Sequence, residues 1–388
     1  MWHTPVRFYF GLHLPPLRRK TYTSRRLKYA GPHNAAPVRK GIHMPITYNN
    51  LFDNIISFEN LYGAFQDTIA HGRKERPDAL AFRFRAEKHI ADIHDALASG
   101  AWRPSPYHRF LCRSEVKRRV IDAPTIGDRI VHMAIYRVLY PLLDRKYIYD
   151  SYACRKGKGC SQAVARVQDF LRRQKRQTGS AYVLQGDISK FYPSIYKPYL
   201  LEKLGRTVRD KRLLELLEAI YYDYNDSDRG VPIGAATSQL AANVVLDTLD
   251  HFAKETLGIR YYVRYMDDFI VIAGDKPQLW AWLRKINWLV TAVLKLRLNP
   301  KTRVFASSQG VDFCGYRTWA THTLPRKRNV KAAKQRFKKL SAAFAAGEID
   351  VADVRQSVAS FRGYMSHCDG YDTTVHVLRN FVLRRNHE

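Results

Sequence analysis

The chain has 388 residues, enough for a large core and two or three subdomains. Its composition, with 46% hydrophobic and 26% charged residues, is typical of a globular protein. Lys and Arg number 65 against 35 Asp and Glu, which leaves a net charge of +30. This charge favours a polyanion such as nucleic acid and also suits a ribosomal or packaging protein. No run of about 18 apolar residues is present, so no membrane partner is expected. Five scattered cysteines without a CxxC pair predict reduced, cytosolic thiols and no zinc site.

Residues 1–52 contain no Asp or Glu and are rich in Arg, Lys and Pro. We predict a basic, flexible N-terminal extension over residues 1–44. It is either an RNA-binding arm, a segment similar to a transit peptide, or sequence upstream of a natural start at Met44.

Apolar residues at helical spacing predict helices over 51–65 and 90–97 and a buried helix over 130–143. Between them, residues 107–121 read as strands around a basic turn. The cations beside this turn either grip phosphates or protect an exposed strand edge. Residues 151–160 form a basic loop with glycines that lacks the spacing of a P-loop.

A short apolar strand over 181–184 leads to Asp187. A carboxylate at the end of a buried strand needs a partner or a metal, or it caps a helix, and a helix is expected near Ser194. A Gly-rich loop over 230–239 then opens a helix over 240–249. Its small residues allow close approach of another chain or a base, or it is a plain loop with Thr237 or Ser238 as the N-cap.

Two acidic residues, Asp267 and Asp268, sit between two apolar β-rich runs and predict the turn of a hairpin. Adjacent carboxylates are either part of an exposed turn or ligands of a cation between them. A helix over 276–294 follows, with Trp280, Trp282 and Trp288 expected in the core. A short strand over 311–316 and three helices, from 329, near 350–364 and near 372–384, complete the chain. The basic residues of the first of these helices either contact a nucleic-acid backbone or form a solvated face.

The strands that carry Asp187 and the two acids of the hairpin could lie side by side, which would place three carboxylates at one sheet edge. This is the layout of a two-metal site for phosphoryl transfer. We expect two Mg²⁺ ions, with Mn²⁺ as a substitute, and Asp187 with Asp267 as the bridging pair. Asp268 is a secondary ligand.

With these motifs the chain resembles reverse transcriptases, of the group II intron-like bacterial kind. Tyr265-Met266-Asp267-Asp268 matches the YxDD box, and residues 187–192 match the first aspartate motif. Residues 298–302 resemble the lysine motif, one residue shorter than usual, and residues 151–160 resemble a loop of the intron-like enzymes. The resemblance covers about residues 50–370 and implies an α+β, right-hand polymerase fold. Its parts would be fingers over 45–180, a palm over 181–320 with an insertion at about 200–236, and a basic helical thumb over 321–388.

The resemblance also implies site residues. The catalytic set is Asp187, Asp267 and Asp268, and Ile188 joins them in the metal set. Tyr192 would reject nucleotides that carry a ribose 2′-hydroxyl, and Phe191 would be a packing residue. Lys301 would either protonate the pyrophosphate leaving group or only hold a phosphate. The nucleotide site is expected to contain Lys117, Arg119, Tyr192, Gln239 and Lys301. The primer grip is expected at Phe313, Cys314, Gly315 and Tyr316.

One departure from the usual pattern narrows the resemblance. Where most of these enzymes carry QGxxxSP, this chain has Ile233-Gly234-Ala235-Ala236-Thr237-Ser238-Gln239. The IGxxxSQ pattern is similar to reverse transcriptases of diversity-generating retroelements, which implies error-prone copying of a template RNA into cDNA. Ile233 cannot donate or accept the side-chain hydrogen bonds of a glutamine, so pairing would be checked less strictly. Ile233, Gly234 and Ser238 are the predicted template and fidelity residues.

The implied partners are template RNA, the cDNA–primer duplex, dNTPs and a small, basic, helical accessory protein oligomer, in the cytoplasm. No nuclease motif follows the predicted thumb. Two alternatives remain: a group II intron-like or antiphage-defence reverse transcriptase, and a non-catalytic RNA-binding protein on this fold.

Overall fold

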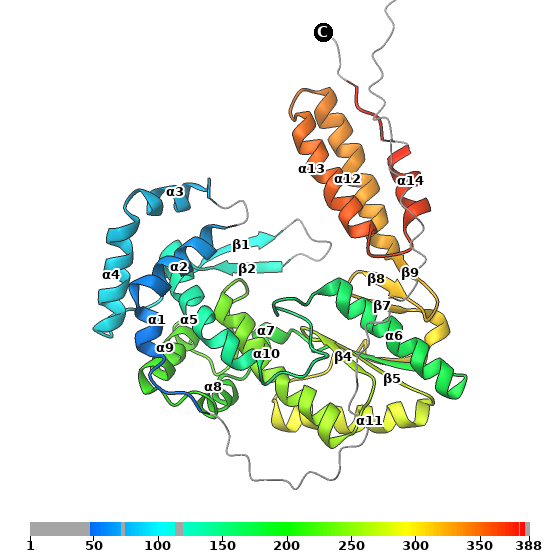
Figure 1. Ribbon diagram of the computed structural model, residues 1–388, viewed down its shortest axis with the longest axis horizontal. Coiled ribbons are helices and arrows are strands. Elements are labelled where there is room, and N and C mark those ends of the chain that lie inside the picture. Colours follow the sequence, from blue (N-terminus) through cyan, green and yellow to red (C-terminus); the bar gives the residue numbers. More distant parts are fainter. Residues whose placement is uncertain (1–46, 71–73, 113–118, 380, 385–388) are drawn as a thin grey trace, which may run out of the picture. The chain divides into compact units, whose positions relative to one another are not determined.

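The computed structural model describes residues 47–70, 74–112, 119–379 and 381–384 (Figure 1). The chain divides into two compact units, a larger one over 46–323 and a smaller one that includes 324–388. Each unit has hydrophobic clusters of its own. The predicted N-terminal extension, residues 1–44, lies outside the described residues.

A four-stranded antiparallel sheet lies at the centre of the larger unit, in the order β4-β5-β3-β6. Its strands are short because polar residues and turns bound each apolar run. They are β3 (Tyr182–Gly186), β4 (Tyr262–Tyr265), β5 (Asp268–Ala273) and β6 (Arg303–Ala306).

Both faces of this sheet are covered, which explains its nearly continuous apolar runs. Alternate residues point to opposite faces. Val183, Ile270 and Phe305 pack in one cluster with helix α6 (Cys160–Thr178). Leu184 and Val271 pack on the other face, in the main cluster to which α10 (Ala236–His251) and α11 (Lys276–Trp288) contribute.

The remaining helices of the larger unit pack around the main cluster or connect its parts (Figure 1). They are α1 (Phe52–Ile56), α2 (Phe58–Ile69), α3 (Pro77–Phe84), α4 (Ala86–Ala98), α5 (Ile126–Asp144), α7 (Phe191–Ser194), α8 (Lys197–Gly205) and α9 (Lys211–Tyr222). α10 and α11 continue into the π-helical turns η1 (Phe252–Thr256) and η2 (Leu289–Val293), and η3 (Ser307–Gln309) is a 3-10 turn.

Two hairpins lie in sheets separate from the central one. β1 (His108–Cys112) pairs with β2 (Arg119–Ala123), and β7 (Val311–Phe313) pairs with β8 (Tyr316–Thr318). The strand β9 (Thr323–Pro325) spans the division between the two units.

The smaller unit is helical. It contains α12 (Lys327–Ala345), α13 (Val351–Met365) and α14 (Tyr371–Arg379). Phe337, Phe361 and Val377, one from each helix, meet in its core. Asp350 begins α13 with a capping box that it forms with Asp353.

The mixed helical and antiparallel fold agrees with the predicted α+β class. The helix predicted over 276–294 is confirmed as α11 with η2, and the one over 130–143 as α5. The helix predicted over 372–384 ends earlier, at Arg379. The tryptophan prediction was wrong in part: Trp280 and Trp288 are 45% and 58% exposed, because Leu279 and Ile286 define the buried stripe of α11.

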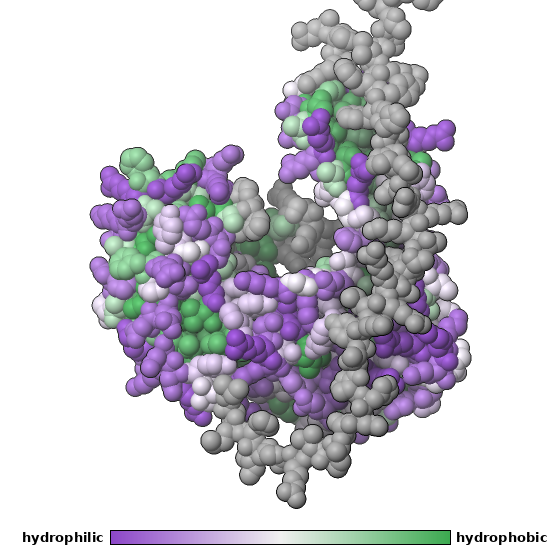
Figure 2. All heavy atoms as spheres, viewed as in Figure 1, coloured by the Kyte–Doolittle hydropathy of each residue, from purple (hydrophilic) through white to green (hydrophobic). Residues whose placement is uncertain are grey.

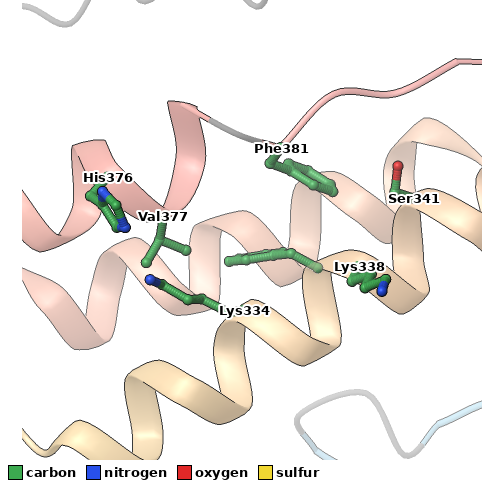
Figure 3. Close-up of a pocket in the computed structure, with 7 residues that line it drawn as sticks. Lys334, Lys338, Ser341, His376, Val377 and Phe381 are labelled. Carbon is green, nitrogen blue, oxygen red and sulfur yellow. The ribbon is translucent and has the colours of Figure 1, made fainter.

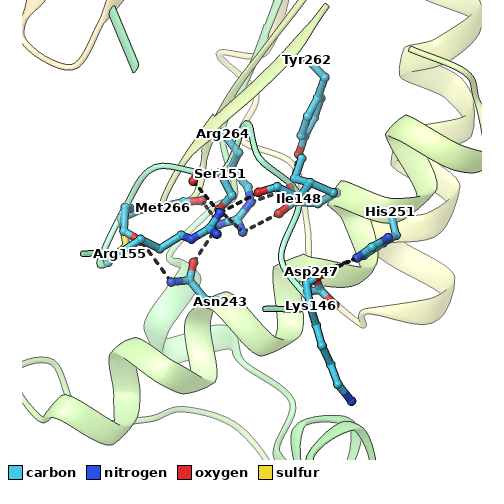
Figure 4. Close-up of polar contacts among 12 residues, drawn as sticks. Lys146, Ile148, Ser151, Arg155, Asn243, Asp247, His251, Tyr262, Arg264 and Met266 are labelled. Carbon is cyan, nitrogen blue, oxygen red and sulfur yellow. Dashed lines mark hydrogen bonds and ion pairs between the residues drawn. The ribbon is translucent and has the colours of Figure 1, made fainter. Parts of the chain in front are cut away.

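A buried ion pair ties β4 to α10 (Figure 4). Arg264 donates from Nε and Nη2 to the two carboxylate oxygens of Asp250, each at 2.7 Å, and both side chains are almost completely buried. Its Nη1 also donates to Asn243 Oδ1 (3.2 Å) and to the carbonyl of Met266 (3.0 Å), and Nη2 donates to Ser151 Oγ (2.9 Å). Burial alone would lower the pKa of this guanidinium, but the charge of Asp250 outweighs it and the pKa is raised.

We expect the variant Arg264→Met to lose about 3–5 kcal/mol of unfolding free energy, because it leaves the carboxylate of Asp250 buried without its cation. Urea unfolding followed by tryptophan fluorescence would measure the loss. The double variant Arg264→Met/Asp250→Leu should recover much of it, since no charge is then buried. If the double variant lost as much unfolding free energy as the two single variants together, this account would be contradicted.

Candidate active site

Three aspartates lie at one end of the central sheet. The register pairs Gly186, the last residue of β3, with Phe269 of β5, so Asp187 follows β3 at the same edge where Asp268 begins β5. Tyr265 pairs with Asp268 across the β4–β5 hairpin, which makes Met266 and Asp267 the two turn residues. The predicted convergence of the acidic motifs on one sheet edge is therefore present in the backbone.

The backbone at this edge is tightly constrained. Met266 has φ of 53°, a left-handed conformation that costs a non-glycine residue roughly 1 kcal/mol or more. Its carbonyl accepts a hydrogen bond from Arg264, which holds the turn from within the protein. At Gly186 a Cβ would stand 2.1 Å from Phe269 Cζ, so only glycine leaves room for the Phe269 ring just before Asp187.

The segment around Asp187 pairs with the lysine motif. Asn299 donates from its backbone N to the Asp187 carbonyl and from Nδ2 to Asp187 Oδ2, both at 2.7 Å. Ile188 forms a β-bridge with Leu298, and its side chain is 1% exposed, so only its carbonyl could reach a metal. The alternative of Asp187 as a helix N-cap is wrong, because Lys190 occupies the N-cap of α7.

The donors at this edge suit a hard divalent cation in kind, because carboxylate oxygens are the ligands that such ions prefer. Among the described residues, no group of three or more His, Cys, Asp or Glu side chains is arranged as a ready-made metal site. A Mg²⁺ site does not require three protein side chains that are already arranged around the ion. Mg²⁺ keeps several waters and is commonly bound by one or two carboxylates together with substrate phosphates.

The predicted nucleotide residues are placed in part. Lys117 and the side chain of Arg119 lie outside the described residues. Tyr192 lies in α7 and its carbonyl accepts from Val231, while Phe191 is buried in the core, as predicted for a packing residue. The backbone N of Lys301 donates to Asn299 Oδ1 at 3.1 Å, which ties the lysine to the partner of Asp187. Gln239 is exposed on α10.

The loop with the unusual sequence packs on the β1–β2 hairpin. The carbonyl of Ile233 accepts from the backbone N of Asp122 at 3.3 Å, and a Cβ at Gly234 would contact Ile121. Ala235 is the N-cap of α10, so the N-cap prediction for Thr237 or Ser238 was wrong. Both side chains are completely buried in the first turn, and Thr237 Oγ1 lies 2.8 Å from His132 Nδ1.

The predicted primer grip is the β7–β8 hairpin rather than a single strand. Cys314 and Gly315 form its two-residue turn, with φ of 48° and 87°. Two positive φ values are the mark of a type I′ turn, whose twist matches that of the flanking strands. Phe313 and Tyr316 bound the turn and are buried, which anchors it.

Two cysteines contact the YxDD box. Cys154 Sγ lies 3.8 Å from Met266 Sδ. Hydrogen bonds with the thiol of Cys314 and with the hydroxyl of Tyr265 lower the pKa of the Cys160 thiol from 9.0 to about 6. Cys160 is exposed at the first residue of α6, so the end of this helix touches both the YxDD box and the predicted primer grip.

The residues that support this edge from behind are not among the site residues predicted from the sequence. They are Arg264, Asp250, Asn243, Asp150 and Asn299. A signal was present for Arg264, which interrupts an apolar strand between Val263 and Tyr265, and for Asn243, which interrupts an apolar helix. Asn243 Nδ2 donates to the carbonyl of Ala153 at 3.1 Å, and the backbone of Asp150 and Tyr152 pairs with Arg264. The 151–160 loop thus lies directly against β4.

The smaller unit has a basic pocket of its own between α12 and α14, with a volume of ≈ 320 Å³. Lys334, Lys338 and His376 surround it over the apolar Val377 and Phe381 (Figure 3). Across the described residues of both units, no helix is long and apolar enough to cross a membrane.

An antiparallel sheet with aspartates at one edge, covered by helices and joined to basic segments, is typical of nucleic-acid polymerases. The family model described as "Reverse transcriptase (RNA-dependent DNA polymerase)" matches residues 113–318. Because this match covers more than half of the sequence, the chain belongs to the reverse transcriptase family, the RNA-directed DNA polymerases.

Its relatives include proteins of group II introns. The chain is 26% identical over 266 residues to Protein YkfC of Escherichia coli (strain K12), a match that covers 58% of this chain and 70% of that protein. It is 22% identical over 362 residues to the group II intron-encoded protein LtrA of Lactococcus lactis subsp. cremoris, covering 73% of this chain and 59% of LtrA. A solved structure of telomerase from Candida albicans, in complex with a fragment of telomeric RNA, aligns with a TM-score of 0.44 at 14% identity. That alignment covers 72% of this chain and 55% of the telomerase chain.

We expect Cys160 to be the fastest-alkylated cysteine at pH 7, because its lowered pKa leaves it mainly as the thiolate above about pH 6. The pKa of Cys154 and that of Cys368 are both raised by burial, which makes them slow internal references. Iodoacetamide labelling between pH 5 and 9, with peptide mass spectrometry, would give the profile of each thiol. A half-maximal rate for Cys160 near that of an ordinary thiol, about pH 8.5, would contradict the predicted hydrogen bonds.

Proposed function

We propose that this chain copies an RNA template into cDNA by nucleotidyl transfer at the edge formed by Asp187, Asp267 and Asp268. The observation that carries the proposal is the sheet register, which brings the end of β3 beside the β4–β5 turn. Separated by about 80 positions in sequence, the two motifs need this pairing to act on one substrate. Two bound Mg²⁺ ions would supply activation of the primer 3′-hydroxyl and charge stabilisation on the triphosphate.

The protein groups have separate roles in this proposal. Asp187 and Asp267 would hold both metal ions and Asp268 would be a secondary ligand, with Mn²⁺ as a substitute metal. Asn299 orients the Asp187 carboxylate through its hydrogen bond to Oδ2. Lys301, held through Asn299, lies on the same support and interacts with the phosphates or the leaving group. Tyr192 excludes the ribose 2′-hydroxyl, and Gln239, Lys117 and Arg119 bind the nucleotide.

The polymerase names follow from the same proposal. Residues 45–180 serve as the fingers, 181–320 as the palm with an insertion at about 200–236, and 321–388 as the thumb. The β7–β8 turn, at Cys314 and Gly315, acts as the primer grip. The basic pocket of the smaller unit, lined by Lys334 and Lys338, supports backbone contact by the thumb.

The variants Asp187→Asn and Asp267→Asn should each lower primer extension by about 1,000-fold or more, because a lost metal contact is worth several kcal/mol in the transition state. Extension of a short DNA primer on an RNA template with Mg²⁺ and dNTPs is the measurement. The matched control is Asp226→Asn, which changes the same charge at an exposed loop position. Activity that survives in Asp267→Asn/Asp268→Asn would overturn the site assignment.

We further propose that the enzyme copies permissively, as in a diversity-generating retroelement, with an accessory protein oligomer as its partner. Supporting this, the loop from Ile233 to Gln239 departs from the usual QGxxxSP pattern, and Ile233 is partly exposed beside the β1–β2 hairpin. Its aliphatic side chain can offer no hydrogen bond to a base or sugar. Ser238 is buried, so it would act by supporting the first turn of α10.

The variant Ile233→Gln should reduce misincorporation opposite template adenine, by about tenfold for one added discriminating hydrogen bond. Sequencing of cDNA made on one RNA template would measure the rate. Ile233→Leu, which restores no hydrogen bond, is the matched control. Equal error rates in the wild type and in Ile233→Gln would remove the support for permissive copying from this loop.

The similarity to LtrA favours a second biological setting, a reverse transcriptase that acts with a group II intron. The chemistry proposed for the aspartates is the same in both settings. Gene neighbourhood separates them, because a near-identical repeat pair that differs at adenines accompanies diversification only.

A further inference from the structure

A basic surface lies at the far end of α6 from the candidate active site. The helix and the loop after β8 together form a shallow depression of ≈ 410 Å³ lined by Arg172, Lys175, Arg176, Ala320 and Thr321, which we call the α6 surface. Arg172 Nε donates to the Ala320 carbonyl at 2.6 Å. α6 runs along the right of the larger unit in Figure 1, where the side chains in Figure 2 are mostly hydrophilic.

The cations of this surface are not neutralised by a carboxylate within the described residues. The neighbouring Arg173 and Arg166 pair with Asp169, at 2.9 Å and 3.6 Å. Among the described residues, by contrast, no carboxylate forms an ion pair with Arg172, Lys175 or Arg176, and all three are exposed. The spacing of three and four residues places them on one helix face, where like charges repel. The negative C-terminal end of the helix dipole offsets the charge of Lys175 and Arg176, but Arg172 lies before the last turn.

The α6 surface is remote from the aspartates. Cys160, the first residue of α6, contacts Tyr265 of the YxDD box through its thiol. At a rise of about 1.5 Å per residue, Arg172 and Arg176 lie roughly 18 and 24 Å further along the helix. β3 likewise begins on this side, at Tyr182, and ends at the other, before Asp187. An anion bound here therefore cannot be the reacting end of a primer.

We propose that the α6 surface binds the phosphate backbone of a folded segment of RNA and so anchors the template RNA at a second point. Three exposed cations on one face that no carboxylate neutralises, beside Thr321, suit phosphate oxygens. RNA helices are read mainly by shape and backbone, so a rigid basic helix needs no base contact. The choice of RNA as the polyanion rests on the proposed reverse transcriptase function.

The test compares two double variants of the full chain that each remove two exposed charges. Lys175→Gln/Arg176→Gln lies on the α6 surface, and Arg284→Gln/Lys285→Gln lies on α11 as the matched control. Arg172 is left in place because it holds the loop. The measurement is binding of a folded RNA hairpin that is longer than α6, at several salt concentrations. Binding should weaken roughly tenfold in Lys175→Gln/Arg176→Gln. The slope of log K against log salt should fall by about two, one for each lost phosphate contact.

A short primer–template that spans only the active site provides the second readout. The α6 variant should extend it at the wild-type rate, whereas a role in the catalytic cleft would slow it. Equal weakening of hairpin binding in both double variants, or no weakening in the α6 variant, would overturn the proposal. Failure of the wild type to extend any primer would instead count against the proposed polymerase function, and the hairpin measurement would still decide whether the α6 surface binds RNA.

Discussion

The ion pair between Arg264 and Asp250 is the interaction on which the candidate active site depends. A charge without access to water is costly unless its hydrogen bonds are satisfied, and Arg264 meets this condition with acceptors from Asp250, Asn243, Ser151 and Met266. These acceptors come from a helix, a loop and the turn that carries Asp267. One guanidinium therefore fixes the position of three chain segments that are distant in sequence.

Backbone strain is concentrated in the same region. Six non-glycine residues of the described chain have positive φ, and four of them, Cys154, Lys190, Met266 and Cys314, fall within the motifs singled out from the sequence. Such conformations persist only where the surrounding structure determines them, and they cluster at functional sites. The buried pair behind Met266 and the anchored β7–β8 hairpin provide that support. The edge that carries the aspartates is thus held in a pre-set geometry before any substrate arrives.

Local sequence patterns predicted the helices and strands well, but they predicted less well which distant residues these elements contact. Apolar alternation identified the hairpin around Asp267 and the strand before Asp187, because both signals lie within a few residues. The hydrogen bonds from Asn299 to Asp187 depend on a pairing across more than 100 positions, which no local pattern contains. The tryptophans of α11 show the same limit: Trp280 and Trp288 are apolar, but which face of a helix is buried depends on the neighbours it meets.

The large positive charge indicates where a polyanion can bind only once the cations in ion pairs are distinguished from the others. Arg155, Arg166 and Arg264 are held by Asp144, Asp150 and Asp250, and these pairs stabilise the fold around the sheet. Acidic residues are scarce, and among the described residues none forms an ion pair with Arg172, Lys175 or Arg176 at the surface. Net charge therefore predicts a polyanionic partner, whereas the pattern of pairing indicates where along the chain that partner can bind.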